Sequence, residues 1–386
     1  MKNHGKWVGG WSCCENILPQ TMGNLFMDTT HRYLIFAGVD GEKVRLRYSN
    51  LRGETPVTID EVFVARALDL KSTAVEENTV TPVTFGGKKS LTLAPGELAI
   101  SDEVPLSFAA GAILSISQYF RGVTELRAGH AMSGEYVSMF YTRGNFAASA
   151  DLPPETTGAL PAYLFLCGVD FYASAGTEAI VAFGDSITQQ PWPDCLARRL
   201  FESGVTDRTV LRKGIGGGKV LRAYDTYRPK MHYGVSGVER FRRDITQPGV
   251  TKVIVLHGIN DIIHPGADNP FCPLSDFPSF DEMIGGYRTY IEAAHSIGAK
   301  IYFATLLPCG RPCMTDGSRP RMELLHRLND WILTCGEHDG AIDFNAAVRS
   351  PEDPDRMPRE YTKDSLHPTL AGARVMAGAI PMEFLR

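Results

Sequence analysis

The feature that most constrains the fold is a repeated rhythm of strand, glycine-rich turn and helix, which begins near Thr177 and continues through the second half of the chain. Apolar runs typical of buried strands lie at residues 179–183, 209–213, 252–256, 300–307 and 341–344. Helical patterns are predicted at residues 194–203, 281–297, 321–335 and 368–384. Strands that alternate with helices form parallel β-α-β units, so we expect a parallel sheet covered by helices on both faces.

The first 175 residues show a different pattern, which is that of β-structure. Short alternating runs such as residues 44–48, 113–117 and 136–140 are separated by turn signals at Asp40-Gly41 and Pro95-Gly96. The longest apolar run, at residues 163–169, is interpreted as a buried strand. We predict a β-sandwich, jelly-roll-like accessory domain over residues 1–175, followed by an α/β domain over residues 176–386.

Charge and hydropathy argue against two classes of protein. The chain has 39 Lys and Arg against 44 Asp and Glu, and the basic residues form no run or stripe, so we expect no nucleic-acid partner. No apolar run approaches the roughly 18 residues that a membrane helix needs, so we expect no membrane association. The first residues are basic but no apolar stretch follows them, and we therefore expect a cytoplasmic protein.

The eight cysteines show no spacing typical of a disulfide framework, so we expect mostly reduced thiols. The pair Cys309 and Cys313 has no second pair that could complete a tetrahedral zinc site, and we predict no metal. The loop that ends in Lys219 resembles a phosphate cradle, but Lys213 and Val220 stand where a Walker loop needs Gly and Ser or Thr. We therefore expect no nucleotide and no other cofactor.

Reactive side chains follow the ends of the predicted strands, which is where an open parallel sheet places its ligand site. Ser186 follows the first strand in Gly-Asp-Ser-Ile-Thr, and Gly217 lies in the glycine-rich run 214–218 after the second. Asn260 follows the third strand in His-Gly-Ile-Asn-Asp. Asp364 and His367 lie together just before the last helix. We expect these five residues to converge on one edge of the sheet.

Their chemistry matches acyl transfer through a tetrahedral intermediate. A serine hydroxyl is inert at neutral pH, so Ser186 needs the imidazole of His367 as a proton acceptor. Asp364 would hold the imidazole in the right tautomer and stabilise its charged form. The backbone N–H groups of Ser186 and Gly217 and the side-chain amide of Asn260 would donate hydrogen bonds to the oxyanion.

These motifs resemble the SGNH, or GDSL, hydrolase family, whose four name residues correspond to Ser186, Gly217, Asn260 and His367. The resemblance covers the chain from about Thr177 onward. It implies a flavodoxin-like three-layer α/β/α domain with Asp364 as the third member of a catalytic triad. The chain departs from the usual family sequence at two places. Lys213 and Gly218 stand near Gly217 where the family often has Asn, and Gln189-Gln190 follows Ile-Thr where the family often has Asp-Gly. These departures concern the contacts with substrate and leave the five residues in place.

The first half resembles, more weakly, the β-rich N-terminal region of the SGNH branch grouped with a xylan-cluster acyl esterase. The similar runs are residues 44–53, 83–87 and 93–96, together with 192–199 and 239–244 in the second half. The resemblance implies hydrolysis of short acyl esters, chiefly acetyl, of a carbohydrate or similar small alcohol, possible substrates being acetylated oligosaccharides. A lipase-like or thioesterase activity on longer chains and a carbohydrate-binding protein with a decayed site are the alternatives. The oligomeric state stays open.

Several neighbouring residues have a plainer interpretation. Asp185 and Asp261 are interpreted as local caps that fix their turns, and His257 as a partly buried residue with satisfied hydrogen bonds. The loop His264 is interpreted as a surface residue. Either packing or a sugar-stacking rim fits the aromatic and basic residues of the long second connection, which are Arg222, Tyr224, Tyr227, Arg228, His232 and Tyr233. Residues 262–280 are a second candidate rim. Met132 and Trp331 are interpreted as packing residues, and we favour a structural role for the β-sandwich.

Overall fold

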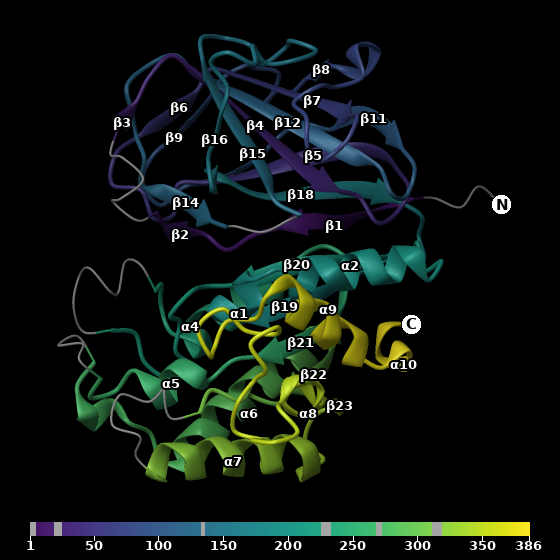
Figure 1. The fold of residues 1–386 in the computed structure, drawn as a ribbon. Helices are drawn as coiled ribbons and strands as arrows, with labels where there is room; N and C mark the ends of the chain where they lie inside the picture. The colour runs from purple at the N-terminus through teal and green to yellow at the C-terminus, as the bar shows by residue number, and fades with distance from the viewer. Residues whose placement is uncertain (1–4, 19–24, 133–135, 225–232, 268–271, 311–318) are drawn as a thin grey trace. The chain divides into compact units, whose positions relative to one another are not determined.

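The computed structural model describes residues 5–18, 25–132, 136–224, 233–267, 272–310 and 319–386 of the chain. The chain divides into two compact units, each described by itself below (Figure 1). One comprises Met1–Glu178 and Leu200–Thr209, and the other Ala179–Arg199 and Val210–Arg386. The domain boundary at residue 175 stays a prediction. Within the described ranges, no helix is long and apolar enough to cross a membrane.

The first unit is rich in antiparallel β-structure, as the sequence predicts. One sheet has the order β1 (Lys6–Ser12), β18 (Leu166–Ala173), β5 (Gly41–Ser49), β10 (Leu98–Ile100), with β11 (Val104–Phe108) also paired to β5. A second has the order β16 (Gly158–Ala159), β15 (Ser138–Arg143), β4 (Thr29–Phe36), β12 (Ile113–Phe120), β7 (Glu61–Ala67), β8 (Thr81–Pro82). Smaller sheets pair β13 (Thr124–Glu125) with β3 (Leu25–Phe26), β6 (Val57–Ile59) with β9 (Leu91–Leu93), and β14 (Ala128–Ala131) with both β17 (Ala162–Leu164) and β2 (Asn16–Ile17). A short 3-10 helix spans Glu77–Thr79.

The apolar run 163–169 forms parts of two strands, β17 and β18, and not the single strand that its sequence indicates. Between them Phe165 has a φ of 59°, a left-handed conformation that a bulky residue rarely adopts. Its buried ring packs against Phe120 at a centroid distance of 5.9 Å, and its carbonyl accepts the N–H of Ser49. These contacts hold a conformation that hydropathy alone does not indicate.

The second unit contains a five-stranded sheet, which confirms the predicted parallel sheet. Its order is β20 (Arg208–Gly214), β19 (Glu178–Gly184), β21 (Val250–Leu256), β22 (Lys300–Ala304), β23 (Gly340–Ile342). The pairs β19–β21, β21–β22 and β22–β23 are parallel. Numbered along the chain, the strand order is 2-1-3-4-5, which is the order of flavodoxin-like folds. In such a sheet the carboxyl ends of the strands meet at one edge.

Helices cover both faces of this sheet (Figure 1). They are α1 (Ser186–Gln189), α2 (Trp192–Glu202), α4 (Gly237–Ile245), α5 (Ile259–Ile263), α6 (Phe280–Ser296), α7 (Arg319–Thr334), α8 (Phe344–Val348), α9 (Leu370–Ala379) and α10 (Met382–Leu385), with a 3-10 turn at Leu274–Asp276. The ring of Tyr302 on β22 stacks on Phe384 of α10 at 4.4 Å, whereas its neighbour Phe303 contacts Tyr287 of α6 at 5.0 Å. Successive side chains of a strand point to opposite faces, so α6 and α10 lie on opposite sides.

Two helices differ from the sequence prediction, each for an identifiable reason. The sequence patterns did not predict helix α4, because its inward face places an ion pair between Arg240 and Asp244, 2.6 Å apart and fully buried, beside the apolar Phe241 and Ile245. The predicted helix 368–384 is two helices, α9 and α10, since Pro381 has no N–H to donate and interrupts the backbone hydrogen bonds.

Candidate active site

Ser186 lies at the carboxyl end of β19, where the chain turns sharply into the short helix α1. Asp185 caps this helix by accepting the N–H of Ile187 at 3.0 Å, which agrees with the interpretation of Asp185 as a cap. A Cβ on Gly184 would lie 2.1 Å from the carbonyl oxygen of Leu256, so the tight turn requires glycine there. As the first residue of the helix, half-buried Ser186 has an N–H without an intrahelical acceptor.

Asp364 and His367 lie on one short loop before α9. The loop turns at Ser365, which has a φ of 72°, and it is closed by the N–H of His367, which donates to Asp364 Oδ1 at 2.7 Å. The N–H of Leu366 donates to the same oxygen at 3.1 Å. The other carboxylate oxygen, Oδ2, lies 2.6 Å from Nδ1 of His367. One carboxylate therefore fixes both the backbone of the loop and the imidazole ring.

The loop brings His367 against Ser186, with Nε2 of the imidazole 2.8 Å from Oγ of the serine. The three side chains thus form a continuous hydrogen-bonded chain from Asp364 through His367 to Ser186. Burial pushes the pKa of Asp364 up, but the backbone and side-chain hydrogen bonds from His367 outweigh it and lower the pKa below its ordinary value. The carboxylate is therefore ionised at neutral pH, so Oδ2 can only accept and the ring proton of His367 lies on Nδ1.

Gly217 lies in the glycine-rich loop after β20, and this loop approaches the serine closely. A Cβ on Gly216 would lie 3.7 Å from Cβ of Ser186. Gly217 has a φ of 74°, and a Cβ there would lie 2.3 Å from the ring of Tyr233, so both conformation and space require glycine. The loop can therefore bring backbone N–H groups to an edge that side chains would otherwise fill.

Asn260 lies in α5, directly after β21, and is buried. Its Nδ2 donates to the carbonyl oxygen of Gly218 at 2.9 Å, which ties the asparagine to the glycine-rich loop. An amide nitrogen carries two hydrogens, so Asn260 has a second N–H besides the one that the Gly218 carbonyl accepts. The structure therefore gathers the predicted residues around two contacts, Ser186 with His367 and Asn260 with the loop of Gly217.

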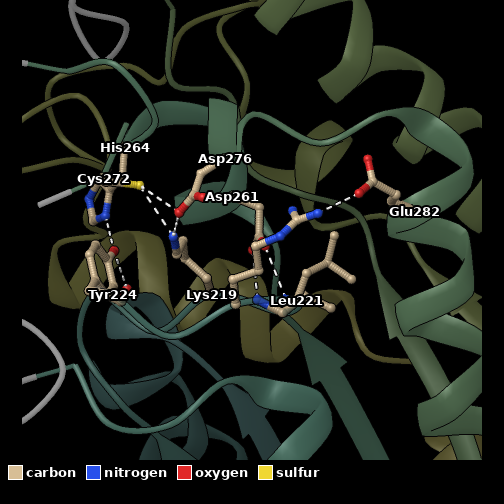
Figure 2. A network of polar contacts seen from close by, with 11 residues as sticks. Lys219, Leu221, Tyr224, Asp261, His264, Cys272, Asp276 and Glu282 are labelled. Atoms are coloured by element: carbon tan, nitrogen blue, oxygen red, sulfur yellow. Dashed lines mark hydrogen bonds and ion pairs between the residues drawn. The ribbon is translucent and has the colours of Figure 1, made fainter. Parts of the chain in front are cut away.

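Asp261 does more than the local capping that the sequence indicates. Its carboxylate accepts the N–H groups of Val220 at 2.7 Å and Leu221 at 3.2 Å, and so holds the end of the glycine-rich loop to α5 (Figure 2). Burial raises the pKa of Asp261 to about 6, and burial raises that of Asp185 to about 7. Two buried carboxyl groups therefore support the turns on which the candidate site is built.

A buried polar cluster beside the loop was not indicated by the sequence. Nζ of Lys219 donates to Asp276 Oδ2 at 2.8 Å and to Sγ of Cys272 at 3.2 Å, and lies 4.5 Å from the ring centre of Tyr224 (Figure 2). The hydroxyl of Tyr224 hydrogen-bonds to Nδ1 of His264. The only signal available was the position of Lys219 directly after the glycine-rich run, next to a strand end.

The remaining predicted residues divide between packing and undescribed parts of the chain. His257 is buried and hydrogen-bonded at both ring nitrogens. His264 is partly buried, and so it is not the surface residue that the sequence indicates. Trp331 packs on Tyr287, and Met132 is buried, as expected of packing residues. Tyr227, Arg228 and His232, and part of the candidate rim 262–280, lie outside the described residues. Among the described residues, no group of three or more His, Cys, Asp or Glu could hold a metal ion.

A known protein family matches the part of the chain that contains the five candidate residues. The sequence pattern of the GDSL-like lipase/acylhydrolase family matches residues 182–375. The chain is similar to an acetylxylan esterase from Geobacillus stearothermophilus, with 19% identity, 54% of this chain and 95% of that chain covered, and a TM-score of 0.40. It is similar to a GDSL-like lipase from Bacteroides thetaiotaomicron, with 19% identity, 54% and 88% coverage, and a TM-score of 0.38. No curated protein sequence gives a significant match.

Proposed function

The chain belongs to the GDSL-like lipase/acylhydrolase family, and on this premise we propose that it is a serine esterase acting through an acyl-enzyme. The observation that carries the proposal is the hydrogen-bonded chain of Asp364, His367 and Ser186, with contacts of 2.6 Å and 2.8 Å. A nucleophile, a base and an orienting carboxylate in that order are what acyl transfer from an ester requires.

In the proposed cycle, Oγ of Ser186 attacks the ester carbonyl carbon while Nε2 of His367 accepts the hydroxyl proton. The negative charge that develops on the carbonyl oxygen is met by the N–H groups of Ser186 and Gly217 and by the second N–H of Asn260. The intermediate collapses, the C–O bond to the alcohol breaks, and His367 returns the proton to the departing alcohol. Water then attacks the acyl-enzyme with His367 as base, which releases the acid and restores Ser186.

For the substrate, we propose a short acyl group, chiefly acetyl, on a carbohydrate or similar small alcohol. This finer assignment is supported by the similarity of residues 44–53, 83–87 and 93–96 to the xylan-cluster esterase branch. We further propose that residues 1–175 form a jelly-roll-like β-sandwich with a structural role, which is supported by the two large antiparallel sheets of that region.

The test is the initial rate of hydrolysis of aryl esters with acyl chains of two, four, eight and twelve carbons. We expect a steep preference for acetyl in the wild type and no measurable turnover in Ser186→Ala or His367→Ala. Equal turnover in wild type and Ser186→Ala would refute the assignment of the nucleophile. A maximum at eight or twelve carbons would replace the proposal by a lipase-like acylhydrolase, and no turnover on any ester would favour a binding protein.

A further inference from the structure

The glycine-rich loop of the proposed oxyanion site presents two consecutive carbonyl groups to buried side chains. The carbonyl oxygen of Gly217 accepts a hydrogen bond from the hydroxyl of Tyr224 at 2.7 Å. The carbonyl oxygen of Gly218 accepts from Nε2 of His257 at 3.1 Å, in addition to Nδ2 of Asn260 at 2.9 Å. Neither Tyr224 nor His257 has a role in the proposed cycle.

The donors and acceptors of these contacts can be assigned without ambiguity at Tyr224. A carbonyl oxygen only accepts, so the single hydroxyl proton of Tyr224 lies on the bond to Gly217. Nδ1 of His264 hydrogen-bonds to the same hydroxyl, and it must therefore carry a proton and donate (Figure 2). Burial and nearby Lys219 lower the pKa of His264 to about 4, so the ring is neutral and has the Nδ1–H tautomer at neutral pH.

The same reasoning fixes the protons at His257. Burial, helped by Arg240, lowers the pKa of His257 to about 3, so the imidazole is neutral and carries one ring proton. That proton lies on Nε2, because the carbonyl of Gly218 can only accept. Nδ1 is then an acceptor, and the hydroxyl of Tyr290, 3.0 Å away, donates to it. His257 is held by a buried tyrosine and in turn holds the loop.

These contacts hold the loop that carries the proposed oxyanion donors. The Gly217 carbonyl, held by Tyr224, and the N–H of Gly218, which donates to the carbonyl of Ile215 at 3.0 Å, belong to one peptide plane. Both ends of this plane are therefore held, which restrains rotation of the neighbouring peptide that carries the Gly217 N–H. The Gly218 carbonyl can only accept, so the amide of Asn260 presents nitrogen to it, and His257 donates to the same oxygen and holds it in place. Resting on the proposed function, we propose that Tyr224 and His257 are positioning residues for the oxyanion site.

The test compares variants that delete one donor at a time and keep the rest of the side chain where possible. Tyr224→Phe removes only the hydroxyl, and His257→Leu removes the imidazole donor. His257→Gln is the conservative variant, since its Nε2 can reach the place of the imidazole Nε2. Tyr33→Phe is the matched control, because Tyr33 is a buried tyrosine of the other unit whose hydroxyl accepts from Leu164 and Gln118.

Each variant is measured for kcat and KM on p-nitrophenyl acetate, for inhibition by phenylboronic acid, which forms a tetrahedral adduct with a serine, and for Tm. Removing one oxyanion donor costs roughly 10² to 10³ in rate, so loosening one should cost about 10-fold to 10²-fold. We expect that loss in kcat for Tyr224→Phe and His257→Leu with KM within about twofold, and equally weakened inhibition by the boronic acid. His257→Gln should recover most of the rate, and Tyr33→Phe should lower Tm and leave kcat unchanged.

A Tyr224→Phe variant with wild-type kcat and a Tm lowered as in Tyr33→Phe would overturn the inference, because the hydroxyl would then serve packing alone. Tyr224→Phe carries the test if His257→Leu does not fold. Turnover in the wild type that is absent from Ser186→Ala keeps the proposed function intact whatever Tyr224→Phe shows. Absence of turnover in the wild type as well would overturn the proposed function and this inference with it.

Discussion

Replacement of Asp364 tests how much of the proposed catalysis depends on one half-exposed carboxylate. In the structure its Oδ2 lies 2.6 Å from Nδ1 of His367, and the side chains of His367 and Asp364 are 26% and 53% exposed. In the proposed cycle, this negative charge would stabilise the imidazolium that forms during attack by Ser186. Asp364→Ala removes the charge and admits water in its place.

The size of the effect follows from Coulomb's law. Opposite unit charges separated by the 2.6 Å of this contact attract by about 1.6 kcal/mol in bulk water and by about 6 kcal/mol at an effective dielectric constant of about 20. Because half of the Asp364 side chain faces solvent, we expect a value between these limits, roughly 3 to 4 kcal/mol, which corresponds to about 10² to 10³ in kcat. Asp364→Ala should therefore retain more activity than Ser186→Ala or His367→Ala.

Asp364→Asn separates the charge from the tautomer. The amide oxygen can still accept the N–H groups of Leu366 and His367, but its NH₂ then faces Nδ1 of the imidazole. Nδ1 becomes an acceptor, and the ring proton moves to Nε2, the atom that must accept from Ser186. We expect Asp364→Asn to be less active than Asp364→Ala.

The assay is kcat on p-nitrophenyl acetate at saturating ester, with the enzyme concentration set by active-site titration and Tm measured for each variant. An Asp364→Ala enzyme within threefold of wild type would refute the electrostatic argument. An Asp364→Asn enzyme more active than Asp364→Ala would refute the argument from the tautomer.

Three further predictions concern pH and the turn at the nucleophile. Activity should fall on acidification, since His367 must be neutral to accept a proton, and a flat acid limb of kcat/KM would contradict its role as base. Burial raises the pKa of Asp185 from 3.8 to about 7, so the folded state keeps a proton that the unfolded chain loses, and the stability contributed by this group falls as the pH rises from about 4 to about 7. In the wild type, this group should lower the unfolding free energy by about 2 to 3 kcal/mol between pH 5 and pH 8, and Asp185→Asn should remove that decrease. The measurement is urea unfolding at both pH values. An unchanged pH dependence in the variant would show that Asp185 is not the group responsible. Gly184→Ala should lower the unfolding free energy by about 3 kcal/mol because its Cβ would lie 2.1 Å from Leu256, whereas Gly378→Ala, which meets no atom within 4 Å, should not.

The sequence predicted the architecture of the second unit well, because strand and turn patterns are local. Each of the five apolar runs overlaps one strand of the sheet, and the ends of run and strand differ by at most three residues. Prediction failed where tertiary contacts override the local pattern. Helix α4 places the ion pair of Arg240 and Asp244 on its inward face. Phe165 adopts a positive φ, and the packing of its buried ring against Phe120 stabilises this conformation.

In the candidate site, too, some residues could be predicted from the sequence and others could not. Ser186, Asn260 and His367 could be found from the sequence because each lies beside a strand end or a helix start, and the sheet brings such positions together. The buried partners of the glycine-rich loop could not be assigned. The hydrogen bond from Tyr224 to Gly217 and that from His257 to Gly218 depend on how the loop folds back, and the residues themselves carry no local signal of it.

Asp364 and His367 are only three positions apart, and their loop is closed by its own backbone, with a bridge between Thr362 and Pro368. Ser186, by contrast, is 181 positions away in the sequence. The carboxylate and the imidazole are therefore held together by their own loop, whereas the position of the imidazole relative to Ser186 depends on the fold of the whole domain. Partial unfolding or a shift of this loop would abolish catalysis with the acid–base pair intact, so a low-field Nδ1 proton resonance would report an assembled pair and not an assembled enzyme.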